Sequence, residues 1–506
     1  MRRQPNALAI SPSMIDRPSN QSRQSRLFDG SLADPDVVRT IDDLGDRIEM
    51  LGSAHERLRE TVGIDEQAAA ITGLDLFHEY IVIFVVAFLV SLLATPLMRR
   101  VAVANGIVDR PAESRKVHRA PVAYLGGVAV FLGILAGVAL SYFAPLMPFK
   151  VFQHHSDIAM PVPISIVGAM TAIMLIGMID DIVGISPRVK IGGQLLTAAL
   201  LAYDDIGVKV AAGLLRPLGA AIGNESMVYG LNLPVPIPMI GDHLQIDVIY
   251  WAGTAIIAIF VLGACNASNL IDGLDGLLSG VTAIAMVGLL LIALTMAVGN
   301  EGRGDGPLDA ARIILTLCVL GACLGFLPHN FNPASIFLGD CGSMLLGFMT
   351  IVIILTLGDT GKTHLVIAGL LIYAVPIIDT TLAIIRRKMA GKSISDADDQ
   401  HLHHQLKRSM GVKGAVLTLY AMGGVFAVLG VGVSLGRGRV VYAIALVVAA
   451  FIVVTAIKIA HRARIEQEAA RYDQRRAREP APAAGPESGP KPPAGPGRDK
   501  PSPTTV

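Results

Sequence analysis

The chain has 506 residues, of which 52% are hydrophobic and only 16% are charged. Together with a mean hydropathy of +0.57, this composition excludes an ordinary soluble domain and is typical of a polytopic membrane protein. A net charge of +1 provides no global field that would attract nucleic acid, so we expect no nucleic-acid partner. The four cysteines lie in or beside apolar segments and form neither a disulfide framework nor a C-x-x-C metal motif.

Three zones follow one another along the chain. Residues 1–75 are polar, and no cleavable signal peptide is predicted there because residues 1–30 lack an apolar core. Residues 77–460 alternate apolar runs with short loops and are expected to form one transmembrane domain. Residues 461–506 begin as a charged helix and end in a Pro/Gly/Ser-rich stretch, which is predicted to be disordered because it has little to bury.

Residues 37–62 of the first zone have the pattern of a short amphipathic helix. Their apolar side chains are spaced alternately by four and three, which is the seam of a coiled coil and predicts self-association into a homodimer. Gly45 and His55 weaken the pattern, and the alternatives are a helix that lies on the membrane or packs on the outer loops. The seam would comprise Val37, Ile41, Leu44, Ile48, Leu51, His55, Leu58 and Val62.

The middle zone contains eleven apolar runs, several of them close to the ~20 residues that a membrane-crossing helix needs. The expected fold class is therefore an all-α polytopic membrane protein with about eleven transmembrane helices. The run at 191–203 is short and could also be a broken helix. The runs cover residues 77–98, 124–145, 162–179, 191–203, 249–265, 281–298, 312–328, 342–358, 364–385, 413–435 and 440–460.

The distribution of basic residues predicts the orientation of these spans. No Lys or Arg lies within 60–76, before the first span, whereas six follow between residues 99 and 119. The positive-inside rule then places the N-terminus outside and this loop in the cytoplasm. Seven basic residues between 386 and 413 fall on the same side by alternation, and the C-terminus is also expected inside.

Five loops that share this predicted cytoplasmic face hold unusual sets of polar residues. A transporter would scatter ionisable groups through the middle of the membrane, whereas an enzyme acting on a lipid head group would gather them at one interface. The loops read "DRPAESRKVHRAPVAYLGG" (109–127), "GMIDDIVGISPRVKIGGQ" (177–194), "NASNLIDGLDGLLSG" (266–280), "FNPASIFLGDCGS" (331–343) and "SISDADDQHLHHQLKRS" (393–409).

Two of the loops present carboxylates directly at the end or start of a span. Asp180 and Asp181 end one span, and adjacent side chains on a helix diverge by about 100°, which indicates two different tasks. One could take a proton while the other holds an orientation or a cation; solvated loop residues are the alternative. Asp340, between Gly339 and Gly342, suits a metal or a phosphate, or else a helix cap.

The 266–280 loop carries four polar side chains at a spacing of three. Asn266, Asn269, Asp272 and Asp275 would drift around a straight helix, but nearby glycines favour a bend that could bring their oxygens to one site. Hard cations bind such oxygen ligands, and an ordinary polar turn is the alternative.

Basic groups surround these acidic residues in the neighbouring loops. Because no cysteine lies near the histidines of "DDQHLHHQL", structural zinc is not expected there. A divalent cation, cationic groups and a base are what phosphoryl transfer needs. The side chains that could donate hydrogen bonds to phosphate oxygens are those of Lys116, His118, Arg188, Lys190, His401, His403 and His404.

Over residues 77–435, the five loops in this order resemble the polyprenyl-phosphate N-acetylhexosamine-1-phosphate transferase family. Its members include the translocase that makes the first peptidoglycan lipid and enzymes that start O-antigen and teichoic-acid linkage synthesis. The resemblance implies a multi-pass enzyme of the bacterial inner membrane that needs Mg²⁺ or Mn²⁺. Its expected partners are undecaprenyl phosphate, a UDP-amino sugar and the membrane lipid, and its expected products are UMP and a lipid pyrophosphoryl sugar.

The resemblance also implies roles for particular residues. Asp180 matches the base proposed for the lipid phosphate, with Asp181 as its partner, and Asp340 matches the principal metal ligand, with Asn269 as a second. Direct attack and a covalent aspartyl intermediate both stay open. The positions expected to bind substrate are Lys116, His118, Lys190, Asp272, Asp275, His401, His403 and His404.

The histidine motif favours one branch of this family. The peptidoglycan enzyme usually has three consecutive histidines, whereas the His-Leu-His-His found here resembles the branch that uses UDP-N-acetylglucosamine. Phospho-N-acetylmuramoyl-pentapeptide transfer is the alternative. The sequence departs from the family at residues 1–75 and 461–506, and in an outer loop, 204–248, that is long enough for a short strand pair.

Two other classes of membrane protein compete with this interpretation. An ion-coupled transporter would need carboxylates inside its spans, and Asp379 is the only good candidate. An intramembrane aspartyl protease would need a Gly-x-Gly-Asp motif, where this chain has Leu338-Gly339-Asp340, and the polar loops would be unexplained.

Overall fold

The computed structural model divides the chain into two compact units, Met1–Ala70 and Ile71–Val506. The first unit contributes a single described residue, so the fold below is that of the second. The predicted coiled-coil seam, the span at 440–460, the charged tail, Lys116 and His118 all lie outside the described residues. The structure describes residue 50 and residues 72–109, 122–143, 161–237, 241–299, 308–359, 361–389, 391 and 401–436.

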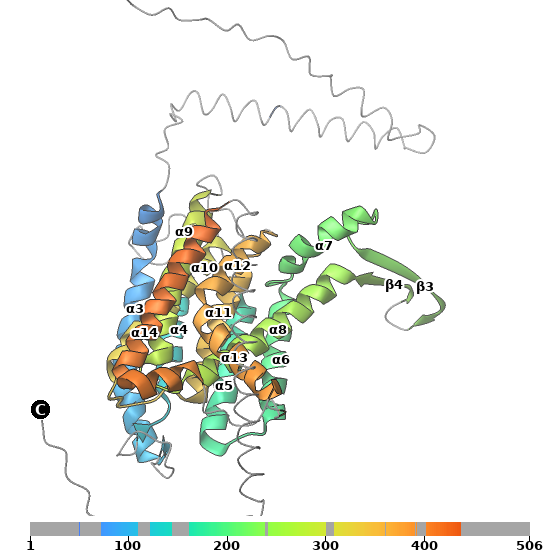
Figure 1. Ribbon diagram of the computed structural model, residues 1–506. Helices are drawn as coiled ribbons and strands as arrows, with labels where there is room; N and C mark the ends of the chain where they lie inside the picture. Colours follow the sequence, from blue (N-terminus) through green and yellow to red (C-terminus); the bar gives the residue numbers. More distant parts are fainter. Residues whose placement is uncertain are drawn as a thin grey trace, which may run out of the picture. The chain divides into compact units, whose positions relative to one another are not determined.

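The described part of the second unit is built mainly of helices (Figure 1). Eight of them are long and apolar enough to cross a membrane, so the prediction of a polytopic, mainly helical membrane protein is confirmed, although the described chain also contains two short antiparallel strand pairs. These eight are α3 (Gly73–Ala104), α4 (Gly126–Phe143), α5 (Ile164–Val183), α8 (Val248–Ile271), α9 (Leu277–Gly299), α10 (Asp309–Asn330), α11 (Gly339–Thr356) and α14 (Leu402–Ser434).

The predicted count of eleven spans is not reached within the described residues. The run at 191–203 corresponds to α6 (Pro187–Tyr203), whose 17 residues fall short of the ~20 that cross a bilayer. The run at 364–385 is divided into α12 (Thr363–Ile372) and α13 (Ala374–Met389), which bend by 79°; the pair adds a ninth span only if both helices belong to one crossing. A total of eleven therefore stays a prediction.

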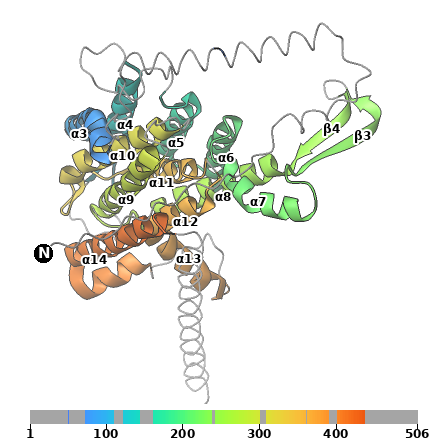
Figure 2. The ribbon, with the colours of Figure 1, turned by 90° about the horizontal axis from the view of Figure 1, so that it is seen from above.

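A second break divides α14. Gly411 has φ 76° and ψ 177°, a backbone conformation that a helix does not contain, so a short segment precedes it and a long apolar segment follows. The predicted span at 413–435 begins just after this break. Figure 2 shows both segments beside α12 and α13.

The predicted strand pair in the outer loop is present. After α7 (Lys209–Ala221), β3 (Val228–Ile237) and β4 (Gly241–Asp247) form an antiparallel hairpin in which Val228 pairs with Asp247. The Asp247 side chain then accepts the Tyr250 N–H at 3.0 Å and caps α8. The hairpin projects beyond α7 and α8, away from α9 to α11 (Figure 2).

Helices α10 and α11 form the centre of the bundle. In each, 89% of the most apolar stretch is buried, compared with 22% in α3. α10 packs against α3, α4 and α9, while α11 packs against α4, α5 and α8. Each outer helix buries one stripe of side chains against the bundle; in α3 this stripe includes Tyr80, Ile83 and Ala87. The opposite face of these helices is apolar and suits contact with lipid.

A buried network of ion pairs lies at the end of the bundle where α10 begins and α11 ends. Arg312 is 1% exposed; it pairs with Asp309, lies 3.8 Å from a carboxylate oxygen of Asp359 and donates from Nε to the Thr356 carbonyl at 2.9 Å. Lys209 of α7 reaches the same Asp359 at 3.0 Å. Pairing is what makes such buried charges tolerable, and the network attaches α7 to the central helices.

Candidate active site

The opposite end of α11 is held by unusually close backbone packing. A Cβ atom on Gly177 of α5 would lie 2.5 Å from the Cys341 Cα, and one on Gly127 of α4 would lie 2.1 Å from the Gly342 nitrogen. No other residue type fits at these two positions without displacing backbone. The glycines therefore allow the backbones of α4 and α5 to pack closely against the first turn of α11, which carries Asp340.

Asp181 fixes the same turn through hydrogen bonds. Its Oδ1 accepts the Asp340 N–H at 2.7 Å, and its Oδ2 accepts the Cys341 N–H at 3.0 Å. These are N–H groups of a helix start, which have no partner within the helix and favour a negative charge. Gly339, at φ +72°, leaves room for the carboxylate, since a Cβ there would lie 2.5 Å from Asp181 Oδ2. Asp181 thus orients Asp340.

Asp180 points to a different partner, as its divergence from Asp181 on the helix predicts. Its Oδ1 accepts the Ile185 N–H at 2.8 Å, and its Oδ2 forms an ion pair with Lys190 of α6. The Lys190 Nζ also donates to Asp340 Oδ2 at 2.6 Å. One ammonium group therefore bridges two carboxylates that lie 160 positions apart in the sequence.

Asn269 completes this centre from α8. Its Nδ2 donates to Asp340 Oδ1 at 2.7 Å and to Ser343 Oγ at 3.0 Å. Helix α8 ends at Ile271, and Gly276 takes φ +77° before α9, so the predicted bend is present. Asn269, Asp272 and Asp275 consequently share one cavity.

Asn266, the fourth member of that series, lies elsewhere. Its Nδ2 donates to Gln194 Oε1 at 2.9 Å and to the Leu262 carbonyl at 2.7 Å, so it joins α8 to α6. It does not line the cavity in the described part of the chain.

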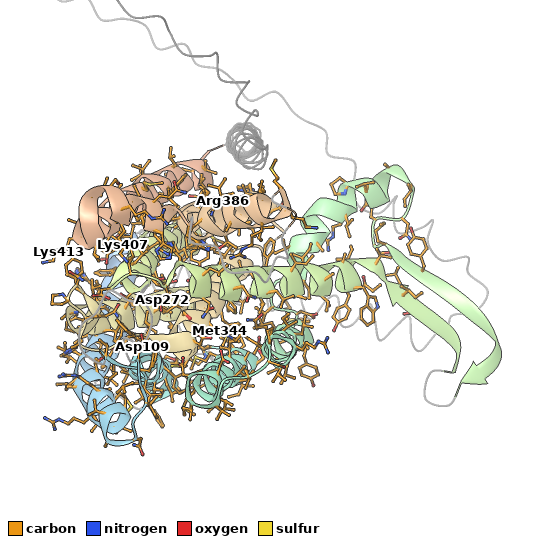
Figure 3. All side chains as sticks on the ribbon, turned by 60° about the horizontal axis from the view of Figure 1, so that its bottom comes forward. Asp109, Asp272, Met344, Arg386, Lys407 and Lys413 are labelled. Atoms are coloured by element: carbon orange, nitrogen blue, oxygen red, sulfur yellow. The ribbon has the colours of Figure 1, made fainter. Side chains whose placement is uncertain are left out.

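The cavity has a volume of about 680 Å³. Figure 3 turns the lower end of the bundle in Figure 1 towards the viewer and labels three of its lining residues, Asp109, Asp272 and Lys407. Polar and charged groups come from the chain between α3 and α4, the α8–α9 turn, the loop between α10 and α11, and the start of α14. The polar residues that line it are Asp109, Tyr124, Asn269, Asp272, Asp275, Asn330, Asn332, Asp340, His404 and Lys407.

Asp275 shapes one wall of the cavity. Its Oδ2 accepts the Asn332 Nδ2 at 2.8 Å and the Ala334 N–H at 3.1 Å, both in the loop before α11. Asn330 supports the same wall, because its Oδ1 accepts the Gly276 N–H at 3.1 Å. At least one oxygen of Asp275 is therefore committed to holding protein backbone.

The histidines are arranged around Asp379, which is buried in α13. Asp379 Oδ2 lies 3.2 Å from His401 Nδ1 and 3.0 Å from His403 Nδ1, and Oδ1 accepts the Leu402 N–H at 2.7 Å. The carboxylate of Asp379 and the imidazoles of His401 and His403 are close enough together to ligate one metal ion. His404 lines the cavity, and His403 Nε2 approaches Gly273, where a Cβ would lie 2.7 Å away.

The pKa values of two cavity residues are raised. Burial raises the pKa of Asp272 to about 8, and the charges of Asp340, Asp181 and Asp275 add to the rise. Burial also raises the pKa of Tyr124, reinforced by Asp109, Asp181 and Asp340. The raised pKa favours the protonated form of Asp272, which can donate a hydrogen bond into the cavity.

Comparison with known proteins fits this arrangement. The model of glycosyl transferase family 4 matches residues 163–358, from α5 to α11. The probable undecaprenyl-phosphate N-acetylglucosaminyl 1-phosphate transferase of Bacillus subtilis is 31% identical over 350 residues, 69% of this chain and 83% of the relative. The chain belongs to the polyprenyl-phosphate N-acetylhexosamine-1-phosphate transferase family. It is therefore a sugar-1-phosphate transferase and a multi-pass membrane protein.

Relatives from two branches of this transferase family match the chain. The decaprenyl-phosphate N-acetylglucosaminephosphotransferase of Mycolicibacterium smegmatis is 32% identical over 425 residues, 80% of this chain and 95% of the relative. The phospho-N-acetylmuramoyl-pentapeptide-transferase of Desulfitobacterium hafniense is 28% identical over 323 residues, 63% of this chain and 87% of the relative.

Within the transferase, the structure gathers most of the predicted site residues and adds others. One group of residues is connected by hydrogen bonds and ion pairs: Asp180, Asp181, Lys190, Asn269 and Asp340. The cavity residues Tyr124, Asn332 and Lys407 were not among the predicted site residues, although each lies in one of the five polar loops, in "VAYLGG", "FNP" and "QLKRS". Asp379 was also left without a predicted partner, which the structure supplies in the histidine motif.

Proposed function

We propose that this chain transfers N-acetylglucosamine 1-phosphate from UDP-N-acetylglucosamine to undecaprenyl phosphate in the bacterial inner membrane. UMP leaves, and the lipid pyrophosphoryl sugar begins a cell-envelope polysaccharide. The observation that carries this proposal is the connected group of residues around Asp340, which opens into a polar cavity at one end of an apolar bundle. A lipid phosphate in the bilayer and a nucleotide sugar in water can both reach such a boundary.

The residues around Asp340 fit Mg²⁺ or Mn²⁺. The carboxylate of Asp340 and the amide oxygen of Asn269 are hard oxygen ligands of the kind that these ions prefer. The Lys190 ammonium already lies between the carboxylates of Asp180 and Asp340, which supports a place for positive charge there. When bound, the ion would neutralise the diphosphate and stabilise the charge that develops on transfer.

The other residues act on the reacting phosphates. The lipid phosphate oxygen attacks the β-phosphorus of the UDP-sugar, a new P–O bond forms, and the bond to the UMP oxygen breaks with its electron pair. Asp180 accepts the proton of the lipid phosphate when that group arrives protonated. Lys190 offsets the negative charge of the two phosphates, and Asp181 keeps Asp340 in place. Prior attack by a carboxylate, giving a phosphosugar-enzyme, is the alternative to direct transfer.

Release of UMP from purified protein with undecaprenyl phosphate and UDP-N-acetylglucosamine tests the proposal. Asp340→Asn should lose at least 100-fold in UMP release, on the order of what one electrostatic contact contributes to catalysis. Its yield and melting temperature should stay near those of the wild type, because the Asp181 hydrogen bonds use the backbone of residue 340, Lys190 keeps Asp180 as a partner, and the asparagine oxygen can still accept from Asn269. Full activity of this variant would remove Asp340 from the chemistry.

The identity of the donor needs a separate comparison, because relatives with both substrates match the chain. The His-Leu-His-His motif favours UDP-N-acetylglucosamine over UDP-N-acetylmuramoyl-pentapeptide. Turnover should be measured with each donor at matched concentrations. A higher kcat/KM with the peptide-bearing donor would assign the chain to peptidoglycan synthesis instead.

A further inference from the structure

The cavity has more acidic groups than cations among its described residues. Asp109, Asp272, Asp275 and Asp340 all line it. Lys190, the ammonium beside Asp340, is already shared between two carboxylates. A nucleotide sugar would bring further negative charge on its two phosphates, so a cationic group that is still available has a clear use here.

Lys407 is such a group. It lines the cavity from the short segment of α14 before Gly411, and it is half-buried. Within the described part of the chain its ammonium forms neither a hydrogen bond nor an ion pair. The negative charge of Asp275 acts on the Lys407 ammonium without a direct contact between them. The Oδ2 atom of Asp275 accepts hydrogen bonds from Asn332 and Ala334 instead.

The position of Lys407 distinguishes it from the residues already assigned. Asp340, Asn269 and Lys190 belong to α11, α8 and α6, whereas Lys407 comes from α14 with His404. Figure 3 labels Lys407 beside the α8–α9 turn that holds Asp272, and Lys413 at the outer edge of the bundle. The cavity reaches from Asp340 to the start of α14, so a nucleotide sugar whose β-phosphorus lies at Asp340 can extend to Lys407.

We propose that the Lys407 ammonium binds the α-phosphate of the nucleotide sugar, the phosphate that departs with UMP. The inference rests on the proposed function for the identity of this ligand. As the bond to the UMP oxygen breaks, negative charge grows on the α-phosphate, and a cation fixed beside it stabilises that charge. Lys407 would then contribute to nucleotide affinity and to the rate of transfer.

The test compares two ligands that differ by the phosphate alone. Binding of uridine and of UMP to detergent-solubilised full-length protein is measured by calorimetry for the wild type, Lys407→Gln and Lys407→Arg. We expect Lys407→Gln to lose about 10- to 100-fold of the preference for UMP, the range for a hydrogen bond to a charged group, with uridine affinity unchanged. Lys407→Arg should retain most of the preference, because it keeps the charge.

Lys413→Gln is the matched control, since Lys413 is an exposed lysine of the same helix outside the cavity. Equal losses of uridine and UMP affinity in Lys407→Gln would overturn the inference in favour of a structural role. An unchanged UMP preference with a raised KM for undecaprenyl phosphate would also overturn it, and would place Lys407 at the lipid phosphate. A wild-type protein that binds UMP no better than uridine would overturn it as well.

The uridine and UMP binding measurements need no turnover, so they separate the inference from the proposed function. If the wild type releases no UMP from UDP-N-acetylglucosamine, yet shows a UMP preference that depends on Lys407, the proposed reaction fails while the phosphate contact stands. If UMP is released and the preference is the same in every variant, the reaction stands and the contact fails.

Discussion

Asp180 and Asp181 are neighbours in the sequence and have different surroundings. Asp181 directs both carboxylate oxygens to backbone N–H groups at the start of α11, whereas Asp180 faces Lys190. Of these two consecutive acidic residues, Asp181 therefore positions α11, and Asp180 pairs with the Lys190 ammonium. Their order could not be exchanged without turning α5 by about 100°.

Asp181→Asn should reduce stability as well as activity. Asparagine has one acceptor oxygen, so one of the two N–H groups would lose its partner, at a cost of about 1–3 kcal/mol for a buried donor. We expect a lower melting temperature together with a loss of UMP release, in contrast to Asp340→Asn. A variant that melts with the wild type would show that the two hydrogen bonds do not hold α11.

Asp272 predicts a pH dependence of stability in metal-free protein. Its pKa is raised from 3.8 to about 8, so between these values the folded protein holds a proton that the unfolded chain has released. Stability from this group is complete at low pH and declines as pH rises towards 8, by at most ~1.4 kcal/mol per pH unit. Relative to Asp272→Asn, which cannot titrate, the wild type should lose melting temperature between pH 5 and 8 in EDTA. A constant difference would contradict the raised pKa.

At this scale, the sequence indicated the carboxylates better than their partners. Asp340 and Asp180 could be predicted because a charged side chain costs roughly 2.5–3.5 kcal/mol at the centre of a bilayer and is rarely incidental in a membrane segment. Asn266 was misjudged because a spacing of three turns each side chain by about 60°, which carries it towards α6. Tyr124 and Lys407 gain their significance only from elements that meet in the folded chain.

Among the elements, α11 depends on contacts that only glycine permits. Gly127 and Gly177 bring the backbones of α4 and α5 against its first turn, where Asp340 and the Asp181 hydrogen bonds are. Close backbone approach through small residues is a common way for helices to associate in membranes. The position of the site is thus decided by helix packing as much as by polar groups.

Gly177→Ala tests this packing directly. The added Cβ would meet the Cys341 backbone at 2.5 Å, so α5 and α11 must separate, at a cost of about 1–3 kcal/mol, with Asp340 displaced. We expect a lower melting temperature and reduced kcat. Gly168→Ala on the same helix is the control, because its Cβ would have no neighbour within 4 Å. Equal behaviour of the two variants would refute the argument.

The broken helices show what hydropathy alone could and could not predict. Residues 364–385 form one apolar run, but Pro376 cannot donate to the Ile372 carbonyl, and α12 ends at Ile372. The proline makes that break predictable from the sequence. The break at Gly411 is not, because glycine also occurs within helices such as α9; at Gly411 the backbone takes φ 76°, which glycine adopts readily.

In the molecule as a whole, the β3–β4 hairpin and the active site lie at different ends of the helices. In Figure 1, α7 and the hairpin lie beside the upper half of the bundle, while α5 and the first segment of α14 lie in its lower half. Helix α3 begins at the hairpin end and finishes at the site end, which fits the alternation from which sidedness was predicted. The placement of the N-terminus outside remains a prediction.

Removing the hairpin should leave catalysis intact. Val228 and Asp247 are paired neighbours, so a two-residue Gly-Ser linker can replace 229–246 while Asp247 still caps α8. We expect kcat and KM for the nucleotide sugar within about twofold of the wild type, well inside one tenfold step in binding. A large loss of kcat with unchanged melting temperature would mean that the hairpin contributes to the reaction.

The ammonium of Lys190 between Asp180 and Asp340 has a consequence for biogenesis. A newly inserted chain has neither cation nor nucleotide at this site, and two unpaired carboxylates in a half-buried position would oppose its assembly. The lysine acts as an internal counter-ion that lets the helices assemble first. We therefore expect the same membrane yield from magnesium-starved and magnesium-replete cells, measured by quantitative blotting. In Lys190→Gln, which lacks that counter-ion, yield should come to depend on the magnesium supply.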